Sequence, residues 1–477
     1  MASFDRAMLQ RLPVRIGLNE SIHQSRWNIL EEKARKLRPF TTSLFLSLPN
    51  ELILEVADYL NLKNLARLSR VNRHLRQLLV SLVYRVGSRE VDPHFKCYLY
   101  TWLHYAAATG DVPLARRLIA EGADPRKWDD TREWSPLYVA VVNGHIEIVE
   151  EFGLTEADMH RRHLGAGASL LHAAVEGRSE YLIRRCIGLG ASIEARDALG
   201  DTPLHHAAGR GNIHIVRLLV ELGAPVNARD RPGLVPLHRA ASARAYWDRP
   251  DTRGETIQFL VSCGAAVDAP DNRGCTPSLV AAGCGNLSSI QLLYALGARL
   301  DERDSMGRAA LHEAASSTMI TDRDNRIAMI NLLCGLGMKV DVRDSMGETP
   351  LHLAAFQGYP EAIRRLVELG AKLDCRNALG QTPLHGVALD DLSIIRLLGA
   401  LGADVNAKDY EGMTPLHQVI IDGTENMALE LIRLGSDLDM KSNDGLTPWD
   451  IAIFEEMETL IEMYKDRYVP EYTLYDS

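Results

Sequence analysis

The sequence has few of the residues on which several classes of protein depend. Its seven cysteines are an odd number with no Cys-x-x-Cys pair, and only 6% of its 477 residues are aromatic. Scattered cysteines of this kind are typical of reduced core thiols, so we expect neither a disulfide framework nor a zinc site. No apolar run approaches the roughly 20 residues that cross a membrane, and Met1–Arg6 does not resemble a signal peptide. We therefore expect a cytoplasmic or nuclear protein.

Charge and motif content exclude further functions. The formal net charge is -10, so the chain has no overall electrostatic attraction to nucleic acid or to an anionic membrane surface. The sequence contains no phosphate-binding loop, dinucleotide-binding glycine motif, zinc-protease motif or nucleophile elbow. We expect no catalytic residue, no cofactor and no metal, and we interpret the chain as a binding protein whose partners include neither nucleic acid nor membrane.

What the sequence does contain is one segment repeated eleven times. In the copy that begins at Thr202, Thr-Pro-Leu-His starts a short helix with a narrow face of leucine and alanine. A second, more apolar helix follows over Ile213–Val220, and Gly223 ends it in the left-handed conformation. An Asp-x-x-Gly turn then leads to the next copy. Because one helix pair cannot cover its own apolar face, stability must come from stacking on the neighbouring copies.

The spacing of the copies is regular with two exceptions. Most intervals are 32 to 34 residues, but the intervals after the fifth and seventh copies are 41 and 40 residues. The helix-capping position is occupied in turn by Thr101, Ser135, Ser169, Thr202, Val235, Thr276, Ala309, Thr349, Thr382, Thr414 and Thr447. We place the extra residues between the two helices, around 243–255 and 316–326. The first insertion carries Trp247 among charged residues, where it either contacts a partner or folds back onto its own repeat.

These copies resemble the ankyrin repeat. The segments 349–355 and 414–417 match the Thr-Pro-Leu-His signature of that family closely. Some copies depart from it, with Tyr138 in place of the histidine or with alanine in place of Thr-Pro at Ala309. The resemblance implies an all-α ankyrin-repeat solenoid over residues 101–466, with short β-turn or hairpin tips between the helix pairs.

The histidines follow the repeat and not a catalytic pattern. Eight of the sixteen occupy the fourth position of the signature, where an imidazole can join one repeat to the next by hydrogen bonds. These eight are His104, His172, His205, His238, His312, His352, His385 and His417. We interpret them as structural residues.

Ahead of the repeats, residues 44–84 show three short helical patterns rich in leucine. Leu52, Val56 and Leu60 fall at four-residue steps on one face of the first helix, and Pro49 suits its first turn. Three helices in about 40 residues bury too little surface to be stable alone. A permanent partner or the adjoining repeats must therefore cover them.

This leucine-rich segment resembles an F-box, the module that attaches a protein to the Skp-type linker subunit of cullin-RING ubiquitin ligases. The order Leu-Pro-x-Glu-Leu, then Leu-x-x-Leu-x-x-Val, carries the resemblance, although Leu75 and Asn72 stand where tryptophan and cysteine are common in the family. A leucine-rich cap on the first repeat is the alternative. The resemblance implies linker-protein contacts through Leu48, Pro49, Leu52, Val56 and Leu60.

The turn tips between the repeats carry a strip of apolar residues. Tips and first-helix faces line the binding side of such solenoids, so we expect this strip, together with Trp247, to contact an apolar surface of a substrate protein. The alternative is that adjacent tips pack on one another. The strip consists of Leu199, Met306, Met346, Leu379 and Tyr410.

Together the two resemblances imply a protein-interaction adaptor. We interpret it as the substrate-recognition subunit of an SCF-like ubiquitin ligase, with the F-box docked on the Skp-type linker and cullin complex and the repeats holding an unknown protein substrate. The alternative is an ankyrin scaffold outside any ligase, whose first helices only cap the solenoid. The predicted segments are an N-terminal arm, an F-box-like domain, a linker, the ankyrin repeats and a C-terminal tail, at 1–43, 44–84, 85–100, 101–466 and 467–477.

Overall fold

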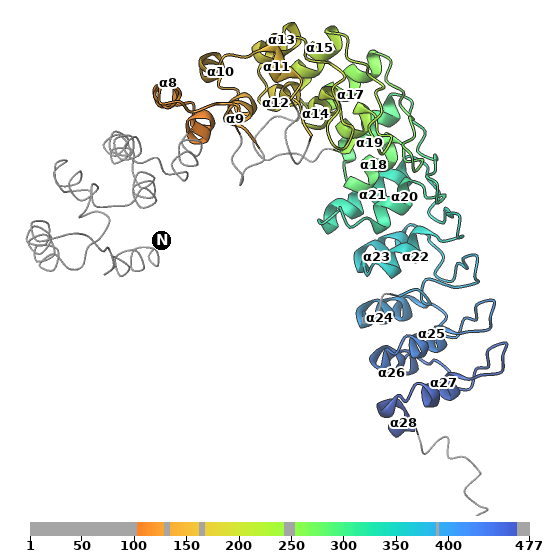
Figure 1. The fold of residues 1–477 in the computed structure, drawn as a ribbon. Helices are drawn as coiled ribbons and strands as arrows, with labels where there is room; N and C mark the ends of the chain where they lie inside the picture. The colour runs from red at the N-terminus through yellow and green to blue at the C-terminus, as the bar shows by residue number, and fades with distance from the viewer. Residues whose placement is uncertain (1–102, 128–133, 162–166, 243–252, 388–390, 465–477) are drawn as a thin grey trace, which may run out of the picture. The chain divides into compact units, whose positions relative to one another are not determined.

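The computed structural model describes most of the repeat array. The described residues are 103–127, 134–161, 167–242, 253–387 and 391–464. The predicted F-box contacts, from Leu48 to Leu60, and Trp247 lie outside them. Every regular element of the described residues is an α-helix, and the helices follow one another in chain order as pairs (Figure 1). The all-α solenoid predicted from the sequence is therefore confirmed.

The first helix of each repeat is short and begins after the predicted capping residue. In the fourth repeat Leu204, Ala207 and Ala208 are buried, as the narrow apolar face requires. The first helices are α9 (Pro136–Val142), α12 (Leu170–Glu176), α14 (Pro203–Gly209), α16 (Pro236–Ser242), α18 (Pro277–Cys284), α20 (Ala310–Ser316), α22 (Pro350–Phe356), α25 (Pro415–Ile421) and α27 (Pro448–Phe454).

The second helix of each repeat supplies a broader apolar face. In α15, Ile215, Val216 and Leu219 are buried, and Gly223 follows its end with a φ of +95°. The second helices are α8 (Val112–Ala120), α10 (Ile146–Phe152), α13 (Glu180–Gly188), α15 (Ile213–Glu221), α17 (Arg253–Ser262), α19 (Leu287–Ala295), α21 (Arg323–Gly335), α23 (Pro360–Glu368), α24 (Leu392–Leu401), α26 (Glu425–Arg433) and α28 (Glu458–Tyr464). One extra turn of helix, α11 (Glu156–Met159), follows α10.

Helices contact their own repeat and its immediate neighbours. First helices pack on first helices, as α14 does on α16 and α16 on α18. Second helices pack on second helices, as α15 does on α17 and α17 on α19. Every substantial helix contact among the described residues joins the same repeat or adjacent repeats. The predicted stacking is therefore confirmed, and each repeat buries its apolar face against adjoining copies.

The ninth repeat departs from the predicted helix pair. After Thr382 the described chain makes a single turn over residues 383–386, where other repeats have a first helix. Gly386 stands where the eighth repeat has Leu353, and glycine in a helix costs about 1 kcal/mol relative to alanine. The expectation of a regular first helix was wrong here because the signature Thr-Pro-Leu-His is present but the residue after it opposes helix formation.

The insertion in the seventh repeat is organised by one buried arginine. Arg326, near the start of α21, is only 3% exposed. Its guanidinium donates to the carbonyl oxygens of Ala314, Ala315, Ser317 and Ile320 over 2.8–3.2 Å, which satisfies the end of α20 and the loop after it. The guanidinium also lies 3.7 Å from the centre of the Tyr359 ring in the next repeat. The inserted residues are therefore fixed to the array, between the two helices as predicted.

The signature histidine starts one helix and bonds to the next repeat. In the fourth repeat, Nδ1 of His205 accepts from the backbone N–H of Thr202 at 3.1 Å and lies 2.9 Å from its hydroxyl oxygen. Nε2 lies 3.0 Å from the carbonyl oxygen of Leu234 in the fifth repeat. Because Nδ1 accepts, Nε2 must carry the proton and donate it. The imidazole therefore caps its own helix and bonds to the following repeat at the same time.

The same bond recurs at every signature histidine. Where the capping residue lacks a hydroxyl, the backbone half of the arrangement remains: the N–H groups of Val235 and Ala309 donate to His238 and His312 at 3.0 Å. The carbonyl oxygens that Nε2 of the eight histidines reaches, over 2.6–3.2 Å, are those of Trp134, Asp201, Leu234, Cys275, Glu348, Gln381, Met413 and Leu446. The structural interpretation of these histidines is thus confirmed.

Burial keeps six of the eight signature imidazoles neutral. Burial lowers the pKa of His205 to about 4, opposed by its hydrogen bond to Leu234. Burial also lowers the pKa of His238, His312, His352, His385 and His417. An unfolded histidine has a pKa of about 6.5. Since the unfolded chain then binds more protons, the contribution of these groups to stability is complete above about pH 6.5 and is lost as the pH falls toward their folded pKa values.

Acidification should therefore destabilise the repeats by protonating the buried signature histidines. We expect His205 alone to cost about 2 kcal/mol of stability at pH 5.0 relative to pH 7.5. The variant His205→Leu, which copies the leucine at Leu279 of the sixth repeat, removes that titration. It should be about 1 to 3 kcal/mol less stable than wild type at pH 7.5, in urea denaturation, because its former partners lose their bonds. The difference should largely vanish at pH 5.0; a difference that is independent of pH would contradict the neutral imidazole.

Candidate protein-binding surface

The turn tips have a uniform hydrogen-bonded geometry. In the tip between the third and fourth repeats, the Asp197 carboxylate accepts from the backbone N–H groups of Leu199 and Asp201, each at 2.9 Å. The N–H of Asp197 donates to the carbonyl of Asp201 at 3.0 Å, which closes the hairpin. Gly200, with a φ of +84°, lies so close to the backbone of Arg231 that a side chain there would clash. The Asp-x-x-Gly pattern therefore forms the short hairpins predicted from it.

Backbone hydrogen bonds join one tip to the next. The N–H of Arg231 donates to the carbonyl of Leu199 at 3.0 Å, and the N–H of Tyr410 donates to the carbonyl of Leu379, also at 3.0 Å. Equivalent bonds join Ser345 to Met306 and Ala378 to Met346, at 2.9 and 2.7 Å. Adjacent tips thus do bond to one another, but through their main chains.

The predicted strip of apolar side chains is exposed to solvent. The exposed fractions of its five side chains lie between 49% and 66%. Four of them directly precede the tip glycine, and Tyr410 stands one residue earlier in its own tip. Exposed apolar side chains of this kind can bind an apolar partner. The five exposed members are Leu199, Met306, Met346, Leu379 and Tyr410.

A ladder of cationic side chains runs along the same tips and was missed in the sequence. Nη1 of Arg343 donates to the carbonyl of Gly347 in its own tip at 2.8 Å and to the carbonyl of Arg376 in the next repeat. Nζ of Lys408 donates to the carbonyl of Lys441 at 2.7 Å. The sequence signal for this ladder is the basic residue that usually precedes the Asp-x-x-Gly turn. The cations that make such inter-repeat bonds are Arg196, Arg229, Arg303, Arg343, Arg376 and Lys408.

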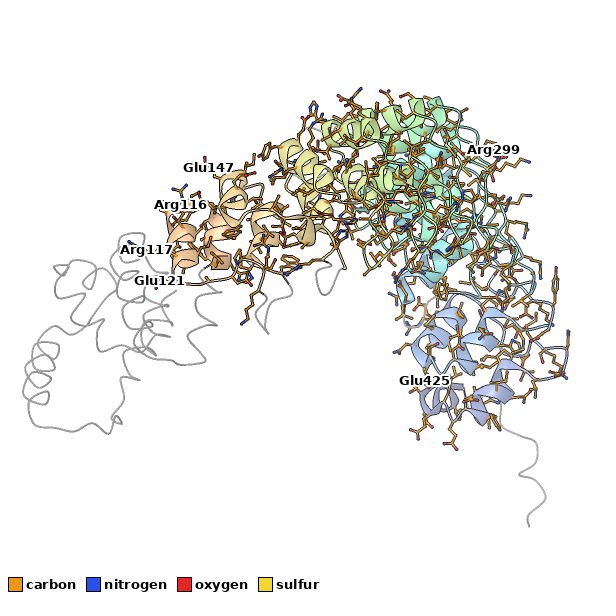
Figure 2. The ribbon with its side chains drawn as sticks, turned by 45° about the horizontal axis from the view of Figure 1, so that its top comes forward. Arg116, Arg117, Glu121, Glu147, Arg299 and Glu425 are labelled. Atoms are coloured by element: carbon orange, nitrogen blue, oxygen red, sulfur yellow. The ribbon has the colours of Figure 1, made fainter. Side chains whose placement is uncertain are left out.

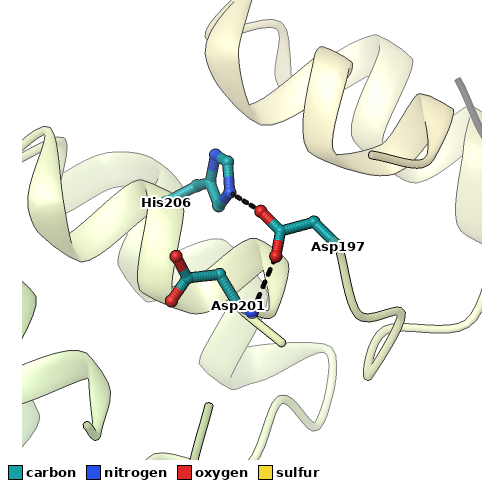
Figure 3. A group of neighbouring side chains, drawn as sticks. All are labelled: Asp197, Asp201 and His206. Carbon is teal, nitrogen blue, oxygen red and sulfur yellow. Dashed lines mark hydrogen bonds and ion pairs between the residues drawn. The ribbon is translucent and has the colours of Figure 1, made fainter. Parts of the chain in front are cut away.

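Charged side chains gather where the third, fourth and fifth repeats meet. Nδ1 of His206, on α14, lies 3.0 Å from a carboxylate oxygen of Glu176. Its Nε2 lies 3.0 Å from a carboxylate oxygen of Asp197 (Figure 3). Burial opposes ionisation of Asp197, but the hydrogen bonds from His206 and from the N–H of Asp201 hold its pKa below the usual value. Burial raises the pKa of Asp201, the third residue of this group.

The charged cluster contains carboxylates and imidazoles close enough to hold a metal ion, but a protein cation already occupies it. The two candidate sets are Asp197, Asp201 and His206, and Asp201, His205 and Asp230. Nη2 of Arg239 lies 2.8 Å from Asp201 and 2.9 Å from Asp230, whose side chains are almost fully buried. His205 also uses both ring nitrogens within the protein. We therefore assign the cluster to repeat packing and place no metal there.

The outward side of the second helices carries charge. Arg116 on α8 is 64% exposed and pairs with Glu151 on α10. Arg116 and Glu147 project away from the ribbon in Figure 2, whereas Glu425 on α26 accepts a hydrogen bond from the backbone N–H of Leu460 at 2.6 Å. These charged sides of the second helices contact solvent and form weak surface ion pairs.

No helix in the described part of the chain is long and apolar enough to span a lipid bilayer.

The contribution of Arg239 to the stability of the charged cluster can be tested by substitution. We expect Arg239→Leu to lower the free energy of unfolding by about 3 kcal/mol, because two buried carboxylates lose their shared cation. Urea denaturation at pH 7.5 measures the change. A second variant, Arg239→Leu with Asp201→Asn, should recover part of the loss since it removes one of the two charges. Equal stability of wild type and the single variant would show that the cluster does not depend on the guanidinium.

Comparison with known families covers most of the chain. A family model described as ankyrin repeats (3 copies) matches residues 69–163, 166–248, 250–344 and 318–409. A second model, ankyrin repeats (many copies), matches residues 400–452. An F-box domain model matches residues 45–86. The F-box followed by ankyrin repeats that the sequence predicted is therefore confirmed.

Curated relatives match only part of the chain. It is 29% identical to the transient receptor potential cation channel subfamily A member 1 of Drosophila melanogaster over 221 residues, which are 44% of this chain and 18% of the relative. It is 31% identical to the putative palmitoyltransferase ZDHHC13 of Danio rerio over 213 residues, 44% of this chain and 26% of the relative. The chain thus spans about a quarter or less of the length of these relatives, and the likeness does not extend to the whole proteins.

Both matched modules are interaction modules and not catalytic domains. The described repeats offer one continuous set of exposed tips and first-helix ends on a stacked scaffold. The chain therefore belongs to the ankyrin-repeat family, carries an F-box domain ahead of its repeats, and is a protein-interaction adaptor.

Proposed function

We propose that this adaptor is the substrate-recognition subunit of an SCF-like cullin-RING ubiquitin ligase. In this role the F-box binds a Skp-type linker protein, and through it a cullin, while the repeats bind the protein to be modified. The observation that carries the proposal is the order of the two modules, an F-box match at residues 45–86 followed by an ankyrin array. The site of action would be the cytoplasm, the nucleus or both.

Such a subunit contributes to the reaction by proximity. Binding one protein to the repeats and the linker to the F-box places a substrate lysine near a ubiquitin-charged enzyme elsewhere in the complex. Holding two reactants together raises their effective concentration and removes much of the entropy cost of their encounter. The stacked repeats suit this task because hydrogen bonds from the imidazoles and the tip cations join most of them to their neighbours.

The linker contacts are proposed from the sequence pattern. Leu52, Val56 and Leu60 fall at four-residue steps, which predict one apolar face of a helix, and the pattern places Leu48 and Pro49 at the start of that helix. An apolar face on a module of about 40 residues needs a covering partner, which a linker protein would supply.

The substrate contacts are proposed at the exposed tips. The side chains of Met306 and Met346 are flexible and polarizable, so they adapt to apolar surfaces of different shape. Leu199, Leu379 and Tyr410 extend the strip along the array. Trp247, in the fifth-repeat insertion, is a further proposed contact from its sequence alone.

Co-purification tests the docking of the F-box. We expect Leu48→Ala with Pro49→Ala to reduce the recovered linker protein and cullin at least tenfold, with the circular dichroism spectrum unchanged. The control is Leu12→Ala with Pro13→Ala, a Leu-Pro pair outside the F-box match, which should keep both partners. Undiminished recovery with the first variant would refute the proposed contact. If wild type recovers neither partner, the protein acts as a scaffold outside a ligase.

A second experiment tests the tip strip. We expect Met306→Ser, Met346→Ser and Leu379→Ser together to reduce the proteins crosslinked to the array severalfold, with little change in thermal stability because the side chains are about half exposed. Met319→Ser with Met463→Ser is the matched control, since these methionines are 55% and 56% exposed away from the tips. If crosslinked partners and stability are both unchanged in the triple variant, the strip is not the substrate site.

A further inference from the structure

Three large apolar side chains at one repeat position are exposed on the last repeats. Phe356, Ile421 and Phe454 each lie seven residues after the capping threonine, at the C-terminal ends of α22, α25 and α27. Their exposed fractions are 58%, 46% and 82%. We call these three residues the apolar column. The equivalent residue of the ninth repeat, Leu389, lies outside the described residues.

The same position is not apolar in the middle of the array. In five consecutive repeats before the apolar column, the residue at this position is small or charged, and none is a large hydrophobic residue. These residues are Glu176, Gly209, Ser242, Gly283 and Ser316. The repeat fold itself therefore does not require a large apolar side chain at the end of the first helix, and the exposed column is a property of repeats eight, ten and eleven.

Carboxylates directly follow two of the three residues of the apolar column. Asp422 directly follows Ile421, and Glu455 and Glu456 directly follow Phe454; all three are exposed. We call these three residues the acidic rim. They end α25 and α27, where the helix dipole adds further negative potential.

The tips of the tenth and eleventh repeats add to this charge. Their three carboxylates, on Asp409, Glu411 and Asp444, outnumber their two cations, Lys408 and Lys441. An apolar surface bordered by negative charge favours a partner that has large apolar side chains with positively charged residues between them.

We propose that the apolar column and its acidic rim bind a lysine- or arginine-rich segment of a partner protein that carries large apolar side chains at regular intervals. The inference deepens the proposed function and rests on it, since it names the chemistry of the substrate segment that the repeats recognise. Stacked helices lie about 8 to 10 Å apart, so anchors that contact successive repeats must have that spacing. An extended chain reaches it with every third residue, at about 3.3 Å per residue.

Synthetic peptides test this specificity with the full-length protein. The probe is a fluorescent 16-residue peptide with leucine or phenylalanine at every third position and lysine and serine between them. One comparison peptide replaces the lysines by glutamate, and another replaces the apolar residues by serine. Fluorescence anisotropy measures binding, and sedimentation equilibrium of the protein alone measures self-association.

Three protein variants separate the contributions. Phe356→Ser, Ile421→Ser and Phe454→Ser together remove the apolar column, and Asp422→Lys with Glu455→Lys reverses the rim. The control, Tyr181→Ser with Tyr294→Ser, alters aromatic residues of similar exposure on the second helices α13 and α19. The rim variant changes only exposed charges, so it keeps the test valid if the column variant does not fold.

The proposal predicts a definite order of peptide affinities. The lysine peptide should bind wild type and the control alike, and at least tenfold more tightly than either comparison peptide. The column variant should lose at least tenfold in affinity, and the rim variant should prefer the glutamate peptide. Equal or tighter binding of the glutamate peptide by wild type, or failure of the lysine peptide to bind, would overturn the proposal. The proposal would also be overturned if wild type formed a dimer and the column variant were a monomer, because a second copy of the chain would then cover the column. Each of these results leaves the F-box docking experiment unaffected, so the two proposals can fail separately.

Discussion

In each repeat with the full signature, a buried histidine accepts a hydrogen bond from the start of its own helix and donates one to the carbonyl of the next repeat. A single such bond contributes about 1 kcal/mol net, but a buried partner left without one costs about 1 to 3 kcal/mol. Helix capping and stacking are therefore coupled in one side chain. The tip cations and the tip main chains add further hydrogen bonds between neighbouring repeats.

Among the described tips, one junction lacks both the histidine and the tip cation. Between the sixth and seventh repeats, Leu279 replaces the histidine and Pro270 replaces the tip cation, so two of the three recurring bonds cannot form. The tip main chains remain joined, with the N–H of Ser305 donating to the carbonyl of Arg273 at 2.7 Å. Ser278, beside Leu279, has a buried hydroxyl without a hydrogen-bond partner. Because a repeat array opens where its nearest-neighbour contacts are weakest, local opening should start at this junction.

Much of the fold could be predicted because local chemistry and repeat spacing agree. The caps, the terminal glycines and the fourth-position histidines each have a physical reason that one copy already reveals. The role of Arg326 could not be predicted, since its carbonyl partners come together only after the insertion folds. The missing first helix of the ninth repeat followed from Gly386, whose effect the intact signature concealed. The exposed tip residues were predicted by position, whereas the apolar column is apparent only when one position is compared across all repeats.

The adaptor role depends on this regularity, since a surface made of equivalent positions keeps its shape only while neighbouring repeats keep their register. The most direct measurement is the protonation of the signature imidazoles in a protein labelled with 15N at histidine. Two-bond and three-bond 1H–15N correlations at pH 7 should show neutral rings with the proton on Nε2, and should show those protons exchanging slowly with solvent. Rings that carry the proton on Nδ1, or that exchange it rapidly, would contradict the hydrogen bonds on which the stacking is argued to depend.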